Sequence, residues 1–143
     1  MLQRIQSVFL LFAAILSIGL VFVFPLWKTN ETVVFAMDTI TNVSMLIKPI
    51  GILFIISAIL SLYTIFQFKN RKLQFVLNRL NILLNLLLVG FIVYQTQNLS
   101  GETLVSEKGI GSFLPIATVF LLAIANRFIK KDEDLVKSVD RLR

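Results

Sequence analysis

The side chains of this sequence best placed for polar chemistry in an apolar setting are a row of amides between residues 71 and 94. Successive members are four, three and four positions apart, which places them on one face of an α-helix. Amides donate and accept hydrogen bonds without titrating, so they can tie helices together or line a polar cavity. This amide row consists of Gln74, Asn78, Asn81 and Asn85.

Catalytic chemistry has little support in the residue types present. The sequence contains no His and no Cys, which removes the commonest general base near neutral pH and any thiolate. The acids of the polar connections are few and show no paired spacing. The glycines Gly109 and Gly111 are not followed by a phosphate-loop pattern and are typical of a turn. We therefore expect no enzyme, no cofactor and no metal site.

The elements that must position the amide row are membrane helices. The chain is 57% hydrophobic and 15% charged, against ~45–50% and about a quarter in soluble domains. The apolar residues gather in four blocks, each near the ~20 residues that a spanning helix needs. The sequence predicts an all-α, single-domain membrane protein, an up-down bundle of four transmembrane helices. The predicted spans are 5–26, 46–68, 73–94 and 113–129, followed by a tail, 130–143.

The first block has an alternative interpretation as a signal peptide, because it follows a short basic start. The apolar run is longer than a signal-peptide core, and no small-residue cleavage site follows it. We therefore interpret 5–26 as a retained membrane helix, with Trp27 at the interface.

The polar connections carry weaker patterns. Segment 28–45 is rich in strand-forming residues around a turn near Met37 and Asp38, so a small β-hairpin is one expectation and an irregular loop the other. Residues 102–105 could add a strand. In the tail, apolar residues at helical spacing predict a short amphipathic helix on the membrane face. They are Leu135, Val136, Val139 and Leu142.

The Lys and Arg residues predict the orientation. The net charge is +6, and the turn 69–72 contains three basic residues and no acid, whereas acids balance or outnumber bases in the connections 28–48 and 95–112. Because cytoplasmic loops are enriched in Lys and Arg, we expect both termini and the 69–72 turn in the cytoplasm. The basic charge then serves membrane orientation, and no nucleic-acid partner is expected.

A charged rim is predicted at the cytoplasmic end. Arg79 lies ~9 Å inside the core if the core begins near residue 73. It either extends to the headgroups or pairs with an acid of the tail. The alternative is a set of separate, solvated side chains. The residues expected to crowd this rim are Arg4, Arg79, Asn126, Arg127, Asp132, Glu133 and Asp134.

The amide row itself leaves two interpretations open. Its bonds could set how the third span packs, or it could line a cavity or bind a lipid headgroup. Asn85 is the deepest member and needs a partner. Ser57 and Ser61, four apart in the second span, would let another helix approach closely.

Three stretches, MLQRIQSVFLLFAAILS, NRLNILLNLLLVGF (78–91) and the ending from residue 121, resemble a domain-of-unknown-function family of small four-helix membrane proteins found mainly in Bacteroidota. The resemblance covers the whole length and implies a bacterial inner-membrane location. It brings no activity or ligand. Asp38-Thr39-Ile40 resembles the acceptor pattern of periplasmic O-glycosylation in that phylum, which makes Thr39 a candidate glycan acceptor.

The expected function is that of a non-catalytic structural or accessory subunit, packed in the bilayer against another membrane protein or itself. The alternatives are a component of a small channel or transporter, a lipid-headgroup-binding protein, and a lipid-modifying enzyme at the rim. The absence of acids inside the apolar blocks disfavours ion-coupled transport by one chain.

Overall fold

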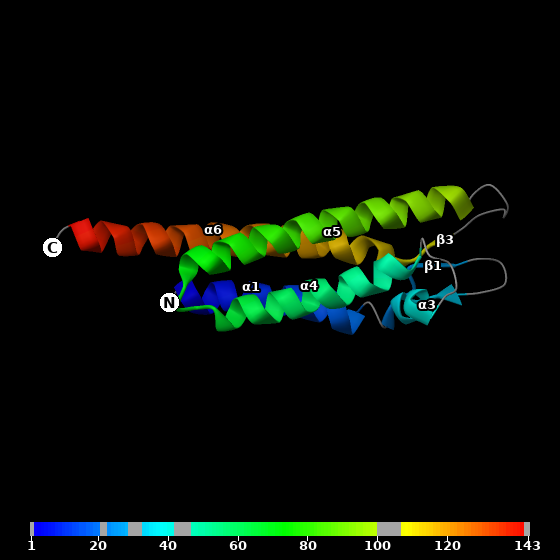
Figure 1. Cartoon of the computed structure of the whole chain (residues 1–143), viewed down its shortest axis with the longest axis horizontal. Coiled ribbons are helices and arrows are strands. Elements are labelled where there is room, and N and C mark those ends of the chain that lie inside the picture. The colour runs from blue at the N-terminus through cyan, green and yellow to red at the C-terminus, as the bar shows by residue number, and fades with distance from the viewer. Residues whose placement is uncertain (1, 21–22, 29–32, 42–46, 100–106, 142–143) are drawn as a thin grey trace.

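The computed structural model describes residues 2–20, 23–28, 33–41, 47–99 and 107–141. Four long helical segments lie side by side in it (Figure 1). They are α1 (Leu2–Ile15), which continues as the π-helical turn η1 (Leu16–Leu20), and α4 (Lys48–Phe66), α5 (Arg71–Leu99) and α6 (Leu114–Arg141).

The helices pack in a ring in which each contacts two neighbours. α1 and α5 each pack against α4 and α6. α1 and α5 run in one direction and α4 and α6 in the other, so the N-terminus lies at the same end of the molecule as the end of α6 (Figure 1). Because α1 and α5 run in the same direction, a residue one turn closer to the start of either helix lies one turn closer to that end of the molecule.

The predicted helical, membrane-type class is confirmed in its coarse form. α4, α5 and α6 are long and apolar enough to cross a membrane. The first apolar helix, Ile5–Ile18, is shorter than a full span within the described residues. Its α-helical part ends at Ile15, ahead of the predicted end at residue 26, because the backbone continues as η1.

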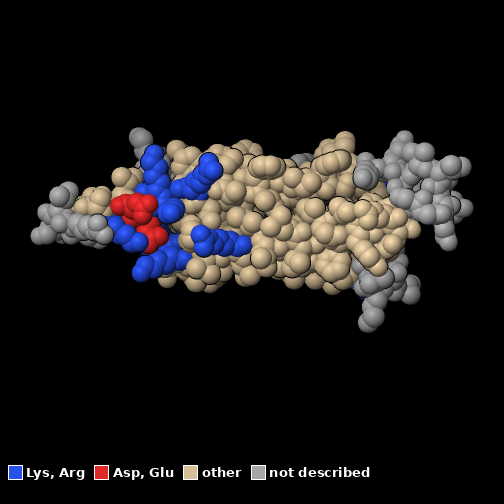
Figure 2. All heavy atoms as spheres, turned by 90° about the horizontal axis from the view of Figure 1, so that it is seen from above, with Lys and Arg blue, Asp and Glu red and all other residues tan. Residues whose placement is uncertain are grey.

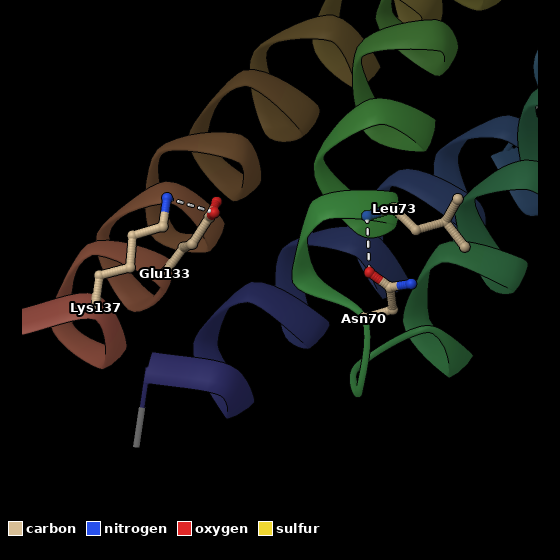
Figure 3. Close-up of polar contacts among 4 residues, drawn as sticks. All are labelled: Asn70, Leu73, Glu133 and Lys137. Carbon is tan, nitrogen blue, oxygen red and sulfur yellow. Dashed lines mark hydrogen bonds and ion pairs between the residues drawn. The ribbon is translucent and has the colours of Figure 1, made fainter. Parts of the chain in front are cut away.

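Two helices run further than predicted, because polar or charged residues were taken to end each apolar span. α5 runs to Leu99, five residues beyond residue 94, and α6 continues without a break to Arg141. The predicted tail helix is therefore the end of α6, because no Gly or Pro interrupts the chain after Pro115. At the start of α5, the Asn70 side chain caps the helix by accepting from the Leu73 N–H at 3.3 Å (Figure 3).

A small three-stranded sheet lies at the opposite end from the termini (Figure 1). β1 (Trp27–Lys28) pairs antiparallel with β2 (Val33–Val34) on one side and with β3 (Glu107–Lys108) on the other. A hairpin does form, but its predicted turn was wrong, because Met37 and Asp38 lie in the helix α3 (Ala36–Thr41). The predicted strand 102–105 lies outside the described residues.

Local side-chain hydrogen bonds explain why this segment is helical. The Asp38 carboxylate accepts from the Phe35 N–H at 3.0 Å, and the Thr39 and Thr41 hydroxyls donate to the carbonyls of Ala36 and Asp38. Such bonds cap and tighten a short helix, and they outweigh the strand preference of the threonines.

The sheet end of the bundle is closed by an apolar core cluster, whose buried members come from β1 and the residue before it, from α3, and from α4, α5 and α6. Gly109 and Gly111 donate backbone hydrogen bonds to the carbonyls of Leu26 and Pro25, at 3.1 and 2.9 Å. A Cβ at Gly109 would overlap the Pro25 carbonyl, so glycine permits this contact. The apolar core cluster consists of Leu26, Trp27, Ala36, Ile50, Phe54, Leu88, Ile92 and Leu114.

Candidate functional site

The predicted amide row lies on α5 and is fully buried at all four positions. Asn81 forms the centre of its contacts with α4. Its Nδ2 donates to the Ser61 Oγ at 2.7 Å and to the Ser57 carbonyl at 3.1 Å, while its Oδ1 accepts from the Ser57 Oγ at 2.8 Å. The two serines that the sequence indicated as small contact residues are thus hydrogen-bond partners.

Asn85, the deepest amide, finds its partner within the same chain. Its Nδ2 donates to the Ser57 Oγ at 2.7 Å, to the Asn81 carbonyl at 2.9 Å and to the Asn81 Oδ1 at 3.1 Å. The Ser57 Oγ also lies 3.4 Å from the Ser17 Oγ of the π-helical turn η1, which brings a third segment to the cluster.

The other two amides bond to backbone carbonyls of both neighbouring helices. Asn78 donates through Nδ2 to the Leu122 carbonyl of α6 at 2.8 Å, and Gln74 donates through Nε2 to the Thr64 carbonyl of α4 at 3.2 Å. Since only the amide nitrogen can donate to a carbonyl, these contacts fix which amide atom is the oxygen. The amide row therefore joins α5 to α4 and α6, as the packing interpretation predicts.

A buried polar residue that the sequence analysis missed is Gln6 of α1, whose amide nitrogen and oxygen have no hydrogen-bond partner among the described residues. Leu10, one turn later, packs with Leu122, the residue whose carbonyl Asn78 contacts. Gln6 therefore lies near the level of Gln74, one turn before Asn78. The position of this polar residue inside an apolar block of the sequence could have indicated that it is buried.

Several amide oxygens at this end of the bundle are also buried without a partner in the described part of the structure. Buried polar atoms are normally paired, and an unpaired one costs about 1–3 kcal/mol. The buried polar atoms at this end therefore form fewer of their possible hydrogen bonds than those of the Ser57–Asn81–Asn85 cluster do. The atoms concerned are Gln74 Oε1, Asn78 Oδ1 and Asn126 Oδ1, whereas in the Ser57–Asn81–Asn85 cluster the Asn85 Oδ1 lacks a partner among the described residues.

The charged rim forms at the end of the molecule where the termini lie, and Lys and Arg gather there around acidic side chains (Figure 2). Its pairing differs from prediction. Asp132 pairs with Arg71 at 2.9 Å, and Glu133 pairs with Lys137, four residues later on α6, at 2.8 Å (Figure 3). Arg71 lies seven residues before Asn78 on the face of α5 toward α6, which explains why it meets the acid.

Arg79 has a different environment from the one predicted. Its guanidinium carbon lies 4.3 Å from the centroid of the Phe75 ring, and the residue is exposed. Arg127 and Asp134 are exposed as well. Arg4 lies in α1, but its side chain falls outside the described part of the structure. The proposed crowding therefore reduces to two ion pairs and a separate, stacked arginine.

The Glu133 carboxylate is the rim group whose titration is perturbed. Its hydrogen bond with Lys137 is the main cause that lowers its pKa, and the positive charges of Lys137, Lys72 and Arg71 contribute further. The carboxylate therefore stays ionised to a lower pH than an ordinary glutamate does.

Thr39 is a poor glycan acceptor in the folded structure. The residue is fully buried in α3, and its hydroxyl donates to the Ala36 carbonyl at 2.6 Å. Gly51 of α4 passes so close that an added Cβ would lie 2.6 Å from this hydroxyl. The structure therefore argues against the predicted modification of Thr39 after folding.

An apolar groove of about 550 Å³ runs along α5 toward the sheet end. A Cβ added at Gly90, in its centre, would meet nothing within 4 Å. Among the described residues, no group of three His, Cys, Asp or Glu side chains is placed to hold a metal ion. The groove is lined by Leu83, Leu86, Leu87, Gly90, Phe91 and Tyr94.

Comparison with known proteins identifies the family. Residues 2–142 match the family described as "Domain of unknown function (DUF4293)". The chain belongs to this family, as the resemblance in its terminal and central stretches indicated. Neither a curated protein nor a solved structure shows detectable similarity to the chain.

Proposed function

We propose that the chain is a four-span integral protein of a bacterial inner membrane, with both termini in the cytoplasm, and a non-catalytic structural or accessory subunit. The observation that carries this proposal is the distribution of polarity. The amides and the serines they contact are buried, whereas large apolar side chains are exposed along the helices, among them Ile59, Val76 and Phe120 at 58%, 59% and 67%. Such a surface suits lipid and is unfavourable in water.

The charged rim supports the orientation. Lys and Arg gather at the end that holds the termini and the α4–α5 turn, which favours a cytoplasmic position for that end. In this arrangement α1, including η1, is the fourth span beside α4, α5 and α6.

The accessory role is supported by how the polar groups are used. Asn81 and Asn85 bond to Ser57 and Ser61 within the bundle, and the apolar core cluster closes the sheet end. Both features disfavour a pore through one chain. The groove at Gly90 offers the surface on which a helix of another membrane protein, or of a second copy, would pack closely.

Membrane topology is testable with single cysteines, because the chain has none of its own. Gln97→Cys lies at the sheet end and Lys131→Cys at the rim, and both positions are exposed. A membrane-impermeant maleimide applied to spheroplasts should label Gln97→Cys and leave Lys131→Cys unlabelled until the membrane is permeabilised. The reverse pattern would contradict the orientation, and labelling of both would contradict membrane insertion.

The accessory role is tested by purification of the tagged chain in mild detergent. We expect a stoichiometric membrane partner or a dimer, lost in Gly90→Phe, which fills the groove, and kept in Ile59→Phe on the exposed face of α4. Mass spectrometry and light scattering report the composition and the mass. A monomer without a partner would rule out this role.

A further inference from the structure

A stripe on the exposed face of α5 combines basic and apolar side chains near the rim. Its members are separated by four, three and four residues, so they lie on one side of the helix. Each is exposed, and the helices that pack on α5 leave this face uncovered. The stripe consists of Lys72, Val76, Arg79 and Leu83.

The stacking contact with Phe75 shows which way the Arg79 side chain points. Phe75 lies one turn nearer the start of α5, so a guanidinium over its ring has turned back toward the rim, by ~6 Å along the helix axis. Lys72 lies ~10 Å before Arg79 in backbone rise. The turn of the arginine toward Phe75 therefore brings the guanidinium to within about one helical turn, along the helix axis, of the backbone position of Lys72.

Neither charge is neutralised by an ion pair in the described ranges of the chain. Two acids of α6 are paired with other cations, Asp132 with Arg71 and Glu133 with Lys137, although the charge of Lys72 also acts on Glu133. Stacking on an aromatic ring leaves the guanidinium edge, with its N–H donors, free to bind an anion. The fork geometry of arginine suits two oxygens of a phosphate group.

From this placement we propose that Lys72, Phe75 and Arg79 form a binding site for the phosphate of an anionic phospholipid in the leaflet next to the rim. Arg79 binds the phosphate oxygens, Phe75 positions the guanidinium, and Lys72 adds a second charge. The acyl chains lie along Val76 and Leu83, which are 59% and 57% exposed. A phospholipid fits because the cations and the apolar stripe occupy the same helix face, whereas a soluble anion would use only the cations.

The inference rests on the membrane insertion proposed above, and it goes beyond the accessory role. The purified protein is placed in nanodiscs of phosphatidylcholine with or without phosphatidylglycerol, and native mass spectrometry counts the lipids retained as the discs are removed. We expect phosphatidylglycerol to be retained in preference to phosphatidylcholine. Arg79→Gln should lower that preference by about tenfold, the effect of one charge-assisted contact of about 1.4 kcal/mol.

Matched variants separate a built site from diffuse attraction. Arg127→Gln removes one positive charge from the same rim, at an exposed position of α6, and should keep the preference. Phe75→Leu keeps the arginine and removes the ring, so it should weaken retention by less than Arg79→Gln does.

Three results would overturn the proposal. Equal losses in Arg79→Gln and Arg127→Gln would mean that net charge alone attracts the lipid. An unchanged preference in Arg79→Gln would remove the site. Competition by millimolar inorganic phosphate as effective as by lipid would mean that a soluble anion is the ligand. Failure to enter nanodiscs of either composition would instead contradict the membrane insertion.

Discussion

The two ends of the bundle interior are built from different chemistry. Toward the rim, the interior contains the amide row with Gln6, Ser57 and Ser61 beside a smaller apolar cluster, and toward the sheet it contains the larger apolar core cluster. In a membrane, moving an apolar side chain from lipid into a protein core gains little beyond van der Waals contact. Apolar burial therefore cannot decide which helix faces meet, whereas a buried amide needs a specific partner. The amide row decides the pairing at one end, and the sheet with its close glycine contacts does so at the other.

The largest expected effect comes from Asn81→Leu. This substitution removes four hydrogen bonds between α4 and α5 or within α5. At about 0.6 kcal/mol per bond in a membrane helix bundle, the free energy of unfolding in detergent should fall by about 2–3 kcal/mol. The measurement is chemical denaturation followed by circular dichroism.

Leu80→Ala, on the exposed face of α5, is the control and should change stability little. Combining Asn81→Leu with Ser57→Ala should give a loss well below the sum of the two single losses, since they remove a shared contact. Additive losses would mean that the Asn81–Ser57 contact does not determine the pairing.

A smaller effect is expected at the sheet end from Gly109→Ala. The added Cβ would overlap the Pro25 carbonyl and displace the backbone that joins β1 to β3. The cost should be about 1–2 kcal/mol, typical of an overpacked site. Gly90→Ala is the matched control, because its Cβ meets open space, and its stability should equal or exceed that of the wild type. Equal effects at the two glycines would contradict the close contact.

The part of the site that could be predicted from sequence is the part that depends on helical periodicity. The spacing of Asn78, Asn81 and Asn85 put them on one face, and the spacing of Ser57 and Ser61 predicted a surface that another helix could approach closely. Only the structure shows that the two surfaces meet. The choice between packing and a cavity required the positions of α4 and α6. The bond from Asn78 to the Leu122 carbonyl leaves no trace in sequence, because every residue carries a carbonyl.

The mispredictions have local causes. Residues 36–41 were assigned to a turn and strand from β-branched composition, whereas Asp38, Thr39 and Thr41 bond to the nearby backbone and favour a helix turn. Arg79 was expected either to extend to the headgroups or to pair with an acid of the tail. The helix face decides instead, and Arg71 is the arginine on the face toward α6. That face became known only from the contact of Asn78 with α6 in the structure.

The amide end should also contain a residue whose removal stabilises the protein. Gln6 is buried, and neither of its amide atoms has a hydrogen-bond partner among the described residues, so Gln6→Met, of similar shape, removes a desolvation cost without leaving a partner unsatisfied. Unfolding stability should rise by up to ~1 kcal/mol, opposite in sign to Asn81→Leu. A loss of 1 kcal/mol or more in the same denaturation assay would mean that Gln6 has a partner in the folded protein. A gain accompanied by loss of function in cells would mark Gln6 as a functional residue.

The smallest effect on stability is expected at the exposed end of α6, where Glu133 and Lys137 form an ion pair at the surface. The Lys137 hydrogen bond lowers the pKa of Glu133 in the folded chain, so the pair stabilises the fold above the ordinary pKa near 4.5. That contribution is lost as the pH falls through the lowered folded pKa.

Lys137→Ala should move the Glu133 pKa back toward 4.5, measured by carbon-13 NMR of labelled glutamate, with no resolvable change in unfolding temperature. Lys131→Ala, which removes an equal charge on α6, should leave the Glu133 pKa nearly unchanged. Equal shifts in the two variants would mean that the field of the whole rim, rather than the Lys137 contact, holds the carboxylate ionised.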